Sequence, residues 1–191
     1  MSPRLSLRRG PTRVGDAVYV GAVWTNGEPI LVADAANVEA WRGSERLDDV
    51  LAAFEGRNED TAPIEGIGYA LQLGFDDGTL DVFRLDDGRV LLVGVMFGSS
   101  DDWPAFVRSA LAAERGPVGT LDVRSGRVAL VSSAADWEDV GKVAANPRRA
   151  APKRRHPADD ALLLDCAAGP HQLLYTFLEQ SEFGLQTWLL A

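Results

Sequence analysis

The sequence predicts an α+β fold that is internally duplicated, mostly antiparallel in its sheet, and arranged about an approximate twofold axis. Short runs rich in β-branched and aromatic residues recur along the chain, and Asn, Asp, Ser and Gly turn signals separate most of them. Stretches with helical spacing of apolar residues lie between these runs. The chain also resembles itself when it is shifted by 99 positions. These observations predict two copies of one unit, each made of a hairpin, a helix and a three-stranded meander.

The internal similarity is strongest between residues 27–41 and 126–140, where about one identity is expected by chance. The identical pairs place Gly27, Leu31, Val32, Ala35, Ala36 and Glu39 against Gly126, Leu130, Val131, Ala134, Ala135 and Glu138. A shorter match, at a shift of 91, aligns residues 70–73 with 161–164. We therefore predict a single domain over 15–191, made of repeats at about 17–97 and 116–191.

The first repeat begins with two β-rich runs, 18–24 and 30–33, joined by Asn26 and Gly27. Both turn residues tolerate positive φ, so they predict a tight hairpin. Asp34 then offers a side-chain oxygen that caps a helical stretch. An apolar stripe at helical spacing follows over 47–54 and predicts a second helix, which Gly56 ends. A three-stranded meander comes next, turned at two Asp-Asp-Gly sequences, with predicted strands at 67–75, 79–85 and 89–97.

A linking helix is predicted at about 101–114, with Ser100 or Asp101 as its N-cap and Gly116 at its end. Pro104 is compatible with the first turn of such a helix. The second repeat follows the plan of the first. Its predicted elements are strands 118–124 and 127–132, a short helix near 135–145, and strands 161–166, 171–178 and 184–190.

Charge is unevenly distributed along the chain, whose formal net charge is −9. Residues 1–14 and 142–156 hold ten of the Lys and Arg residues and no Asp or Glu, which leaves −19 on the other 162 residues. We interpret 1–14 as a flexible basic tail and 146–160 as a mobile basic loop, because Pro and Ala interrupt any periodic pattern there. An acidic body repels nucleic acid and anionic lipid and attracts basic partners, so we expect neither nucleic acid nor membrane as a partner.

No sequence pattern for catalysis or metal binding is present. Cys166 is the single cysteine, and with His156 and His171 it cannot supply a zinc site of four Cys and His ligands. Neither a G-x-S-x-G elbow nor a phosphate-binding glycine loop occurs. We therefore expect no enzyme activity, no cofactor and no metal. Because the sequence contains no 18-residue apolar run and no export-signal core, we also expect a cytoplasmic protein.

A set of turn and core residues resembles a known family. The residues that carry the resemblance are Trp24, the run GEPILV at 27–32, Trp41, Arg42, Gly43, Asp48 and Asp49. From about residue 17 onward, the chain resembles the immunity protein 21 family of bacterial polymorphic toxin systems. The resemblance implies a protein that binds and neutralises a cognate toxin by protein–protein contact, and it implies no catalytic residue.

Two other function classes stay open on the residues alone: a small enzyme that uses carboxylates, and a regulatory module that binds a ligand between the repeats. For the immunity function we predict a partner surface at one end of the first meander. In an antiparallel meander, the loop 55–65 and the turn at 86–88 lie at the same end. We therefore expect a negative cluster suited to a basic toxin, made of Glu59, Asp60, Glu65, Asp86 and Asp87.

Overall fold

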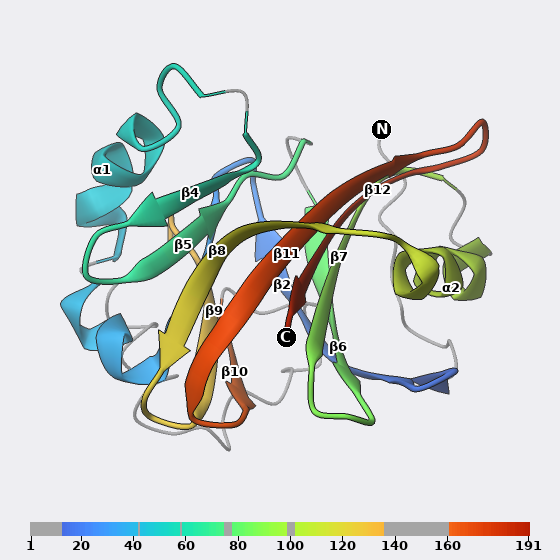
Figure 1. The fold of residues 1–191 in the computed structure, drawn as a ribbon. Coiled ribbons are helices and arrows are strands. Elements are labelled where there is room, and N and C mark those ends of the chain that lie inside the picture. The colour runs from blue at the N-terminus through green and yellow to red at the C-terminus, as the bar shows by residue number, and fades with distance from the viewer. Residues whose placement is uncertain (1–12, 42, 58, 75–77, 99–101, 136–160) are drawn as a thin grey trace.

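A computed structural model describes residues 13–41, 43–57, 59–74, 78–98, 102–135 and 161–191. In it, two antiparallel sheets pack face to face, with helices on their outer sides (Figure 1). The mostly antiparallel α+β fold predicted from the sequence is confirmed. Of the basic tail predicted over 1–14, Arg13 and Val14 form a short strand, and residues 1–12 lie outside the described residues. Most of the helix predicted near 135–145 and the basic loop also lie outside them. None of the described helices is long and apolar enough to cross a membrane.

The larger sheet has seven strands in the order β1-β2-β6-β7-β12-β11-β8. Their bounds are β1 Arg13–Val14, β2 Ala17–Thr25, β6 Gly78–Leu85, β7 Val90–Phe97, β12 Gly184–Leu190, β11 Gly169–Glu179 and β8 Gly116–Val123. The smaller sheet has five strands in the order β10-β9-β3-β5-β4. Their bounds are β10 Ala161–Asp165, β9 Arg127–Ser132, β3 Ile30–Asp34, β5 Gly68–Leu71 and β4 Thr61–Ile64.

Three apolar clusters hold these layers together. The first fills the space between the two sheets and is centred on large side chains such as Trp188, Leu92 and Leu130. The second lies between the five-stranded sheet and the helical segment η1 Ala35–Ala40, η2 Gly43–Arg46 and α1 Leu47–Ala52. The third lies between the seven-stranded sheet and α2 Trp103–Ala112, which covers its outer face (Figure 1). Both sheets are therefore buried on two sides over much of their area.

The two predicted hairpins are wrong. β2 pairs with β1 and β6, whereas β3 pairs with β5 and β9, so the connection through Asn26 and Gly27 passes from one sheet to the other. The connection between β8 and β9 does the same. Gly27 has the positive φ that the turn signal predicts, at 96°. However, β5 and β9 occupy both edges of β3, and its residues pack against the other sheet on one face and the helical segment on the other.

The predicted meanders are correct only in their last two strands. β6 and β7 pair as a hairpin, and so do β11 and β12. The strand expected to precede each hairpin belongs instead to the five-stranded sheet, as β5 in the first case and β10 in the second. The linking helix is present as α2, but Gly116 does not end it, because Gly116 is the first residue of β8.

The alignment at a shift of 99 does not match faces of the sandwich. It pairs Leu31 with Leu130, but Leu31 packs in the cluster beside the helices, whereas Leu130 packs between the sheets. Successive side chains of a strand point to opposite faces, so an alignment that is wrong by one residue exchanges the faces.

Candidate functional site

The candidate site is a small pocket at the edge of the sandwich, where the segment before β4 meets β8 and β11. Its volume is about 160 Å³. Its lining residues are Glu59, Asp60, Thr61, Val118 and Tyr175. Two acidic residues, a hydroxyl-bearing ring and an aliphatic side chain therefore face one depression. We call it the acidic pocket.

Buried hydrogen bonds fix the floor of the acidic pocket. The Tyr175 hydroxyl donates a hydrogen bond to Oδ2 of Asp60. Trp188 Nε1 donates to Oγ1 of the buried Thr61 at 2.8 Å, and the rings of Trp188 and Tyr175 lie 5.0 Å apart. Burial, together with the hydrogen bond to Asp60, raises the pKa of Tyr175 above its usual range. The hydroxyl therefore stays protonated at neutral pH and can keep donating to the carboxylate.

The backbone around Asp60 is anchored as well. The Asp60 carbonyl accepts a hydrogen bond from the backbone N–H of Gln72 at 3.0 Å. The side chain of Gln186, in β12, donates to the carbonyl of Gln72 at 3.2 Å and accepts from the backbone N–H of Gly74 at 2.8 Å. Asp60 is thus held by contacts to both sheets, and its carboxylate has a fixed position in the pocket.

The apolar wall of the pocket comes from a β-bulge. Opposite Leu173 and Leu174 of β11, the register of β8 passes from Gly119 to Pro117, which leaves Val118 as the extra residue. A bulge locally re-aims the side chain of its extra residue. The Val118 side chain is 40% exposed as a result, although it lies beside a buried network.

Glu59 and Asp60 are the two predicted partner-binding residues that the structure brings together, since both line the acidic pocket. Glu65 follows β4, whereas Glu59 and Asp60 precede it, so a strand of about 13 Å separates them. Asp86 and Asp87 lie in the turn between β6 and β7 in the other sheet. The predicted single cluster of five carboxylates is therefore wrong, because it required β5 to pair with β6.

Asp86 and Asp87 are also partly neutralised by arginines. Arg13 donates two hydrogen bonds to the carboxylate of Asp86, at 2.8 and 2.9 Å, and Arg89 donates to Asp87 at 2.7 Å. Hydrogen bonds from these arginines lower the pKa of each carboxyl group below its usual value. This turn carries paired charges, not the concentrated negative field expected from its sequence.

Thr61, Val118 and Tyr175 are site residues that sequence reasoning missed. Each lies in a strand and has the side chain of an ordinary core or surface strand residue, so no local pattern marks it. Their contribution depends on β8 and β11 lying beside the segment that leads into β4. That proximity is a long-range property of the two-sheet arrangement.

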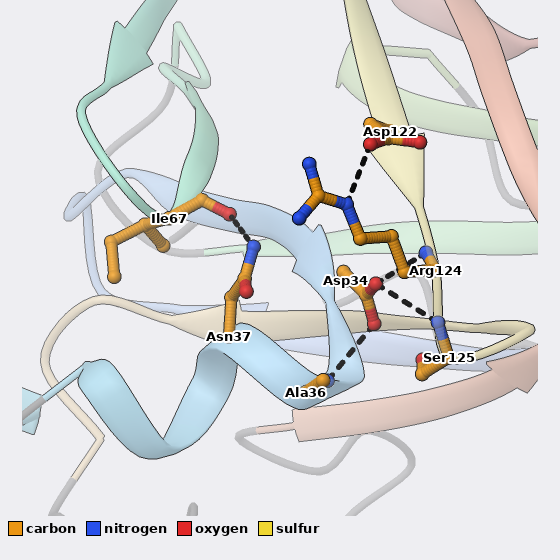
Figure 2. A network of polar contacts seen from close by, with 7 residues as sticks. All are labelled: Asp34, Ala36, Asn37, Ile67, Asp122, Arg124 and Ser125. Atoms are coloured by element: carbon orange, nitrogen blue, oxygen red, sulfur yellow. Dashed lines mark hydrogen bonds and ion pairs between the residues drawn. The ribbon is translucent and has the colours of Figure 1, made fainter.

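Asp34 is the centre of a polar network between the sheets (Figure 2). One carboxylate oxygen accepts from the backbone N–H of Ala36 at 2.9 Å, so the predicted helix cap is confirmed. The other accepts from the backbone N–H groups of Ser125, at 3.0 Å, and Arg124. Burial would raise the pKa of Asp34, but these hydrogen bonds outweigh it and lower the pKa. The groups that donate to Asp34 belong to the cap of η1 and to the turn between β8 and β9, so we assign it a structural role.

Cys166 and His171 lie close together across the β10–β11 turn. The Cys166 sulfur is 3.5 Å from Nε2 of His171, and the same nitrogen is 2.7 Å from the carbonyl oxygen of Ala167. A nitrogen so close to a carbonyl carries a proton and donates it, so it cannot also accept a proton from the thiol. Burial and the nearby charge of Asp34 raise the pKa of the Cys166 thiol. The pair lacks the activated thiolate that nucleophilic catalysis needs.

Alkylation of Cys166 provides a direct check of this assignment. In the folded chain at pH 7.5, we expect iodoacetamide to react with Cys166 about tenfold more slowly than in the unfolded chain, because thiolate is the reactive form. The His171→Asn variant should react no more slowly than the parent chain. If Cys166 is alkylated faster in the folded than in the unfolded chain, and His171→Asn abolishes that difference, then His171 does activate the thiol.

No group of three or more His, Cys, Asp or Glu side chains in the described part of the chain lies close enough to hold a metal ion. No protein-family model, curated protein or solved structure matches the chain. The acidic pocket and the charges around it are therefore the features from which a function can be inferred.

Proposed function

We propose that this chain is an immunity protein that binds a bacterial toxin protein and neutralises it by direct contact, with a Lys or Arg side chain of the toxin seated in the acidic pocket. The observation that carries the proposal is the pocket itself, in which Glu59 and Asp60 lie beside the exposed Val118. The resemblance of the sequence to the immunity protein 21 family supports the same function. We further propose that the protein acts in the bacterial cytoplasm, without an enzyme activity, cofactor or nucleic acid of its own.

The composition of the pocket suits a long cationic side chain. Lys and Arg have an aliphatic stem and a charged head, which favour apolar and anionic surroundings respectively. Val118 offers an apolar surface to the stem, and Asp60 offers a carboxylate whose position the Tyr175 hydroxyl fixes. A carboxylate that is already ordered loses little conformational freedom when a partner binds.

Glu59 is the adjustable acidic group of the pocket. Its side chain is 70% exposed and lies 3.8 Å from the guanidinium of Arg57, which is itself about half exposed. Exposed ion pairs of this kind contribute little to stability, so Glu59 can exchange Arg57 for a cation of a partner at small cost. The formal net charge of −9 adds long-range attraction toward a basic surface, which raises the association rate.

The test is binding of the purified chain to the toxin encoded by the neighbouring gene. We expect Glu59→Arg to slow association by about tenfold and to reduce its salt dependence, because the variant reverses a charge at the point of contact. Glu182→Arg is the matched control, since Glu182 is exposed in the turn between β11 and β12 and the charge change is identical.

Two results would count against the proposal. Equal effects of Glu59→Arg and Glu182→Arg would mean that only net charge matters and that the acidic pocket is not the contact. Failure of the parent chain to bind or protect against the toxin would remove the immunity function itself. Thermal unfolding of each variant confirms that the differences do not arise from misfolding.

We also propose that the chain arose by duplication of one unit, with an offset of 98, not 99. The orders β2-β6-β7 and β8-β11-β12 correspond within the seven-stranded sheet, as β3-β5 and β9-β10 do within the other. The same offset relates the bulge residues Val20 and Val118. In each sheet, two residues that lie opposite each other where the repeats meet are also 98 positions apart. They are Val32 and Leu130 on β3 and β9, and Leu91 and Leu189 on β7 and β12. An offset of 98 keeps equivalent side chains on the same face.

A further inference from the structure

A second and larger depression lies between the C-terminal end of α2 and the outer face of the seven-stranded sheet. Its volume is about 320 Å³. Leu91, Leu189 and Leu174 form its floor on the neighbouring strands β7, β12 and β11, where Leu91 is opposite Leu189 and Leu189 is opposite Leu174. Arg89 and Arg115 also line it, together with Asp16. We call it the arginine cleft, and it shares no lining residue with the acidic pocket.

Arg115 is held in a fixed position at the cleft. Its guanidinium donates to Oγ1 of Thr187 at 3.2 Å, to the carbonyl of Ala113 at 3.0 Å and to the carbonyl of Ala110. An arginine has five N–H donors, so two remain for a ligand. Its side chain is partly buried, and no carboxylate among the described residues forms an ion pair with it.

The charged groups around the cleft leave an excess of positive charge at Arg115. Burial and the neighbouring positive charge of Arg89 lower the pKa of Arg115. Both guanidinium groups belong to residues that line the same cleft, so an anion between them would relieve their mutual repulsion. Arg89 keeps its hydrogen bond to Asp87 at 2.7 Å. Asp16 adds a negative charge to the lining, so a ligand with a single negative charge fits better than a dianion.

We propose that the arginine cleft binds a small monocarboxylate that has a short apolar chain. The carboxylate accepts hydrogen bonds from Arg89 and Arg115, and the apolar chain lies on the floor formed by Leu91, Leu174 and Leu189. The size of the cleft is at the lower end of the range for small-molecule sites, which suits a short chain. This inference is independent of the proposed immunity function, because it concerns the opposite side of the seven-stranded sheet.

The test uses octanoate as the probe, with two comparison compounds. Octanamide has the same chain without the charge, and acetate has the same charge without the chain. We expect octanoate to bind measurably in calorimetry and to raise the thermal midpoint, and to bind at least about tenfold more tightly than either comparison compound, because charge-assisted hydrogen bonds and apolar burial act together. Equal binding of octanoate and octanamide would overturn the proposal.

Variants locate the binding to the cleft. Arg89→Gln should weaken octanoate binding by about tenfold, as expected for the loss of one charged donor. Arg108→Gln, on an exposed position of α2 outside the cleft lining, is the matched control and should leave the affinity unchanged. Leu174→Trp fills the floor and should abolish binding while the chain stays folded. Undiminished binding in Leu174→Trp, or equal losses in the two arginine variants, would refute the assignment.

Discussion

The Asp81→Asn variant is expected to keep most of its stability as the pH rises above about 4, whereas the free energy of unfolding of the parent chain should fall. Asp81 is 2% exposed, and its Oδ1 has no hydrogen-bond partner among the residues that the structure describes. Burial raises the pKa of this carboxyl well above its ordinary value. Between the ordinary and the raised pKa, the folded state keeps a proton that the unfolded state releases. The free energy of unfolding should therefore fall by about 1.4 kcal/mol per pH unit in that interval.

The surroundings of Asp81 explain why no group compensates its charge. It lies in β6 opposite Ala22 of β2 and Val93 of β7, on the face that α2 covers. Tyr19 is the titratable neighbour, and burial together with the charge of Asp81 raises its pKa above the usual range. Neither Ala22 nor Val93 offers a side-chain hydrogen-bond donor.

Chemical unfolding across a pH series measures this effect as a difference between the two chains. Asp48→Asn is the matched control, because Asp48 is exposed in α1 and its replacement should leave the slope unchanged. If the free energy of unfolding depends on pH in the same way in the parent chain and in Asp81→Asn, then Asp81 is not buried in a protonated state.

The Gly68→Ala variant is expected to lose about 3 kcal/mol of stability, because overpacking against rigid backbone cannot be relieved by a rotamer change. Gly68 is the first residue of β5 and pairs with Ala33 of β3 and Ile64 of β4. A Cβ atom at this position would overlap the carbonyl oxygen of Val32 and lie 3.1 Å from the Cα of Ala33. The alanine therefore forces β3 and β5 apart at the centre of the five-stranded sheet.

Gly66→Ala separates this steric effect from the general cost of replacing glycine. Gly66 has a φ of +74°, and a Cβ there would meet none of the described residues within 4 Å. Its replacement should cost about 1 kcal/mol, the strain of an alanine at positive φ. Denaturant midpoints of the two variants give the comparison. A Gly68→Ala midpoint at or above that of Gly66→Ala would mean that β3 and β5 do not approach as closely as described.

Local patterns in the sequence predicted most of the elements. The strand expected at 79–85 corresponds to β6, that at 127–132 to β9 and that at 184–190 to β12. These predictions succeed because β-branched runs, turn glycines and helix caps act over a few residues. The positive φ at Gly27 and the cap provided by Asp34 were predictable for the same reason.

The assignment of strands to sheets could not be predicted in this way. Asn26 and Gly27 permit a sharp reversal of the chain, but the reversal joins either two paired strands or two stacked sheets. The pairing of β3 with β5 and β9 decides between them, and both of these strands lie far along the chain from β3. The acidic pocket could not be predicted for the same reason. Tyr175 and Val118 come from the second half of the chain, whereas Glu59 and Asp60 come from the first.

The position of β12 has a consequence for how the chain reaches its folded state. β12 follows every other described strand in the sequence, yet it lies between β7 and β11 in the middle of the seven-stranded sheet (Figure 1). All seven of its residues are buried. While the chain is being synthesised, β7 therefore has an unpaired edge until residues 184–190 emerge, and such edges recruit strands from other chains. The nascent chain is accordingly exposed to edge-to-edge association until β12 inserts.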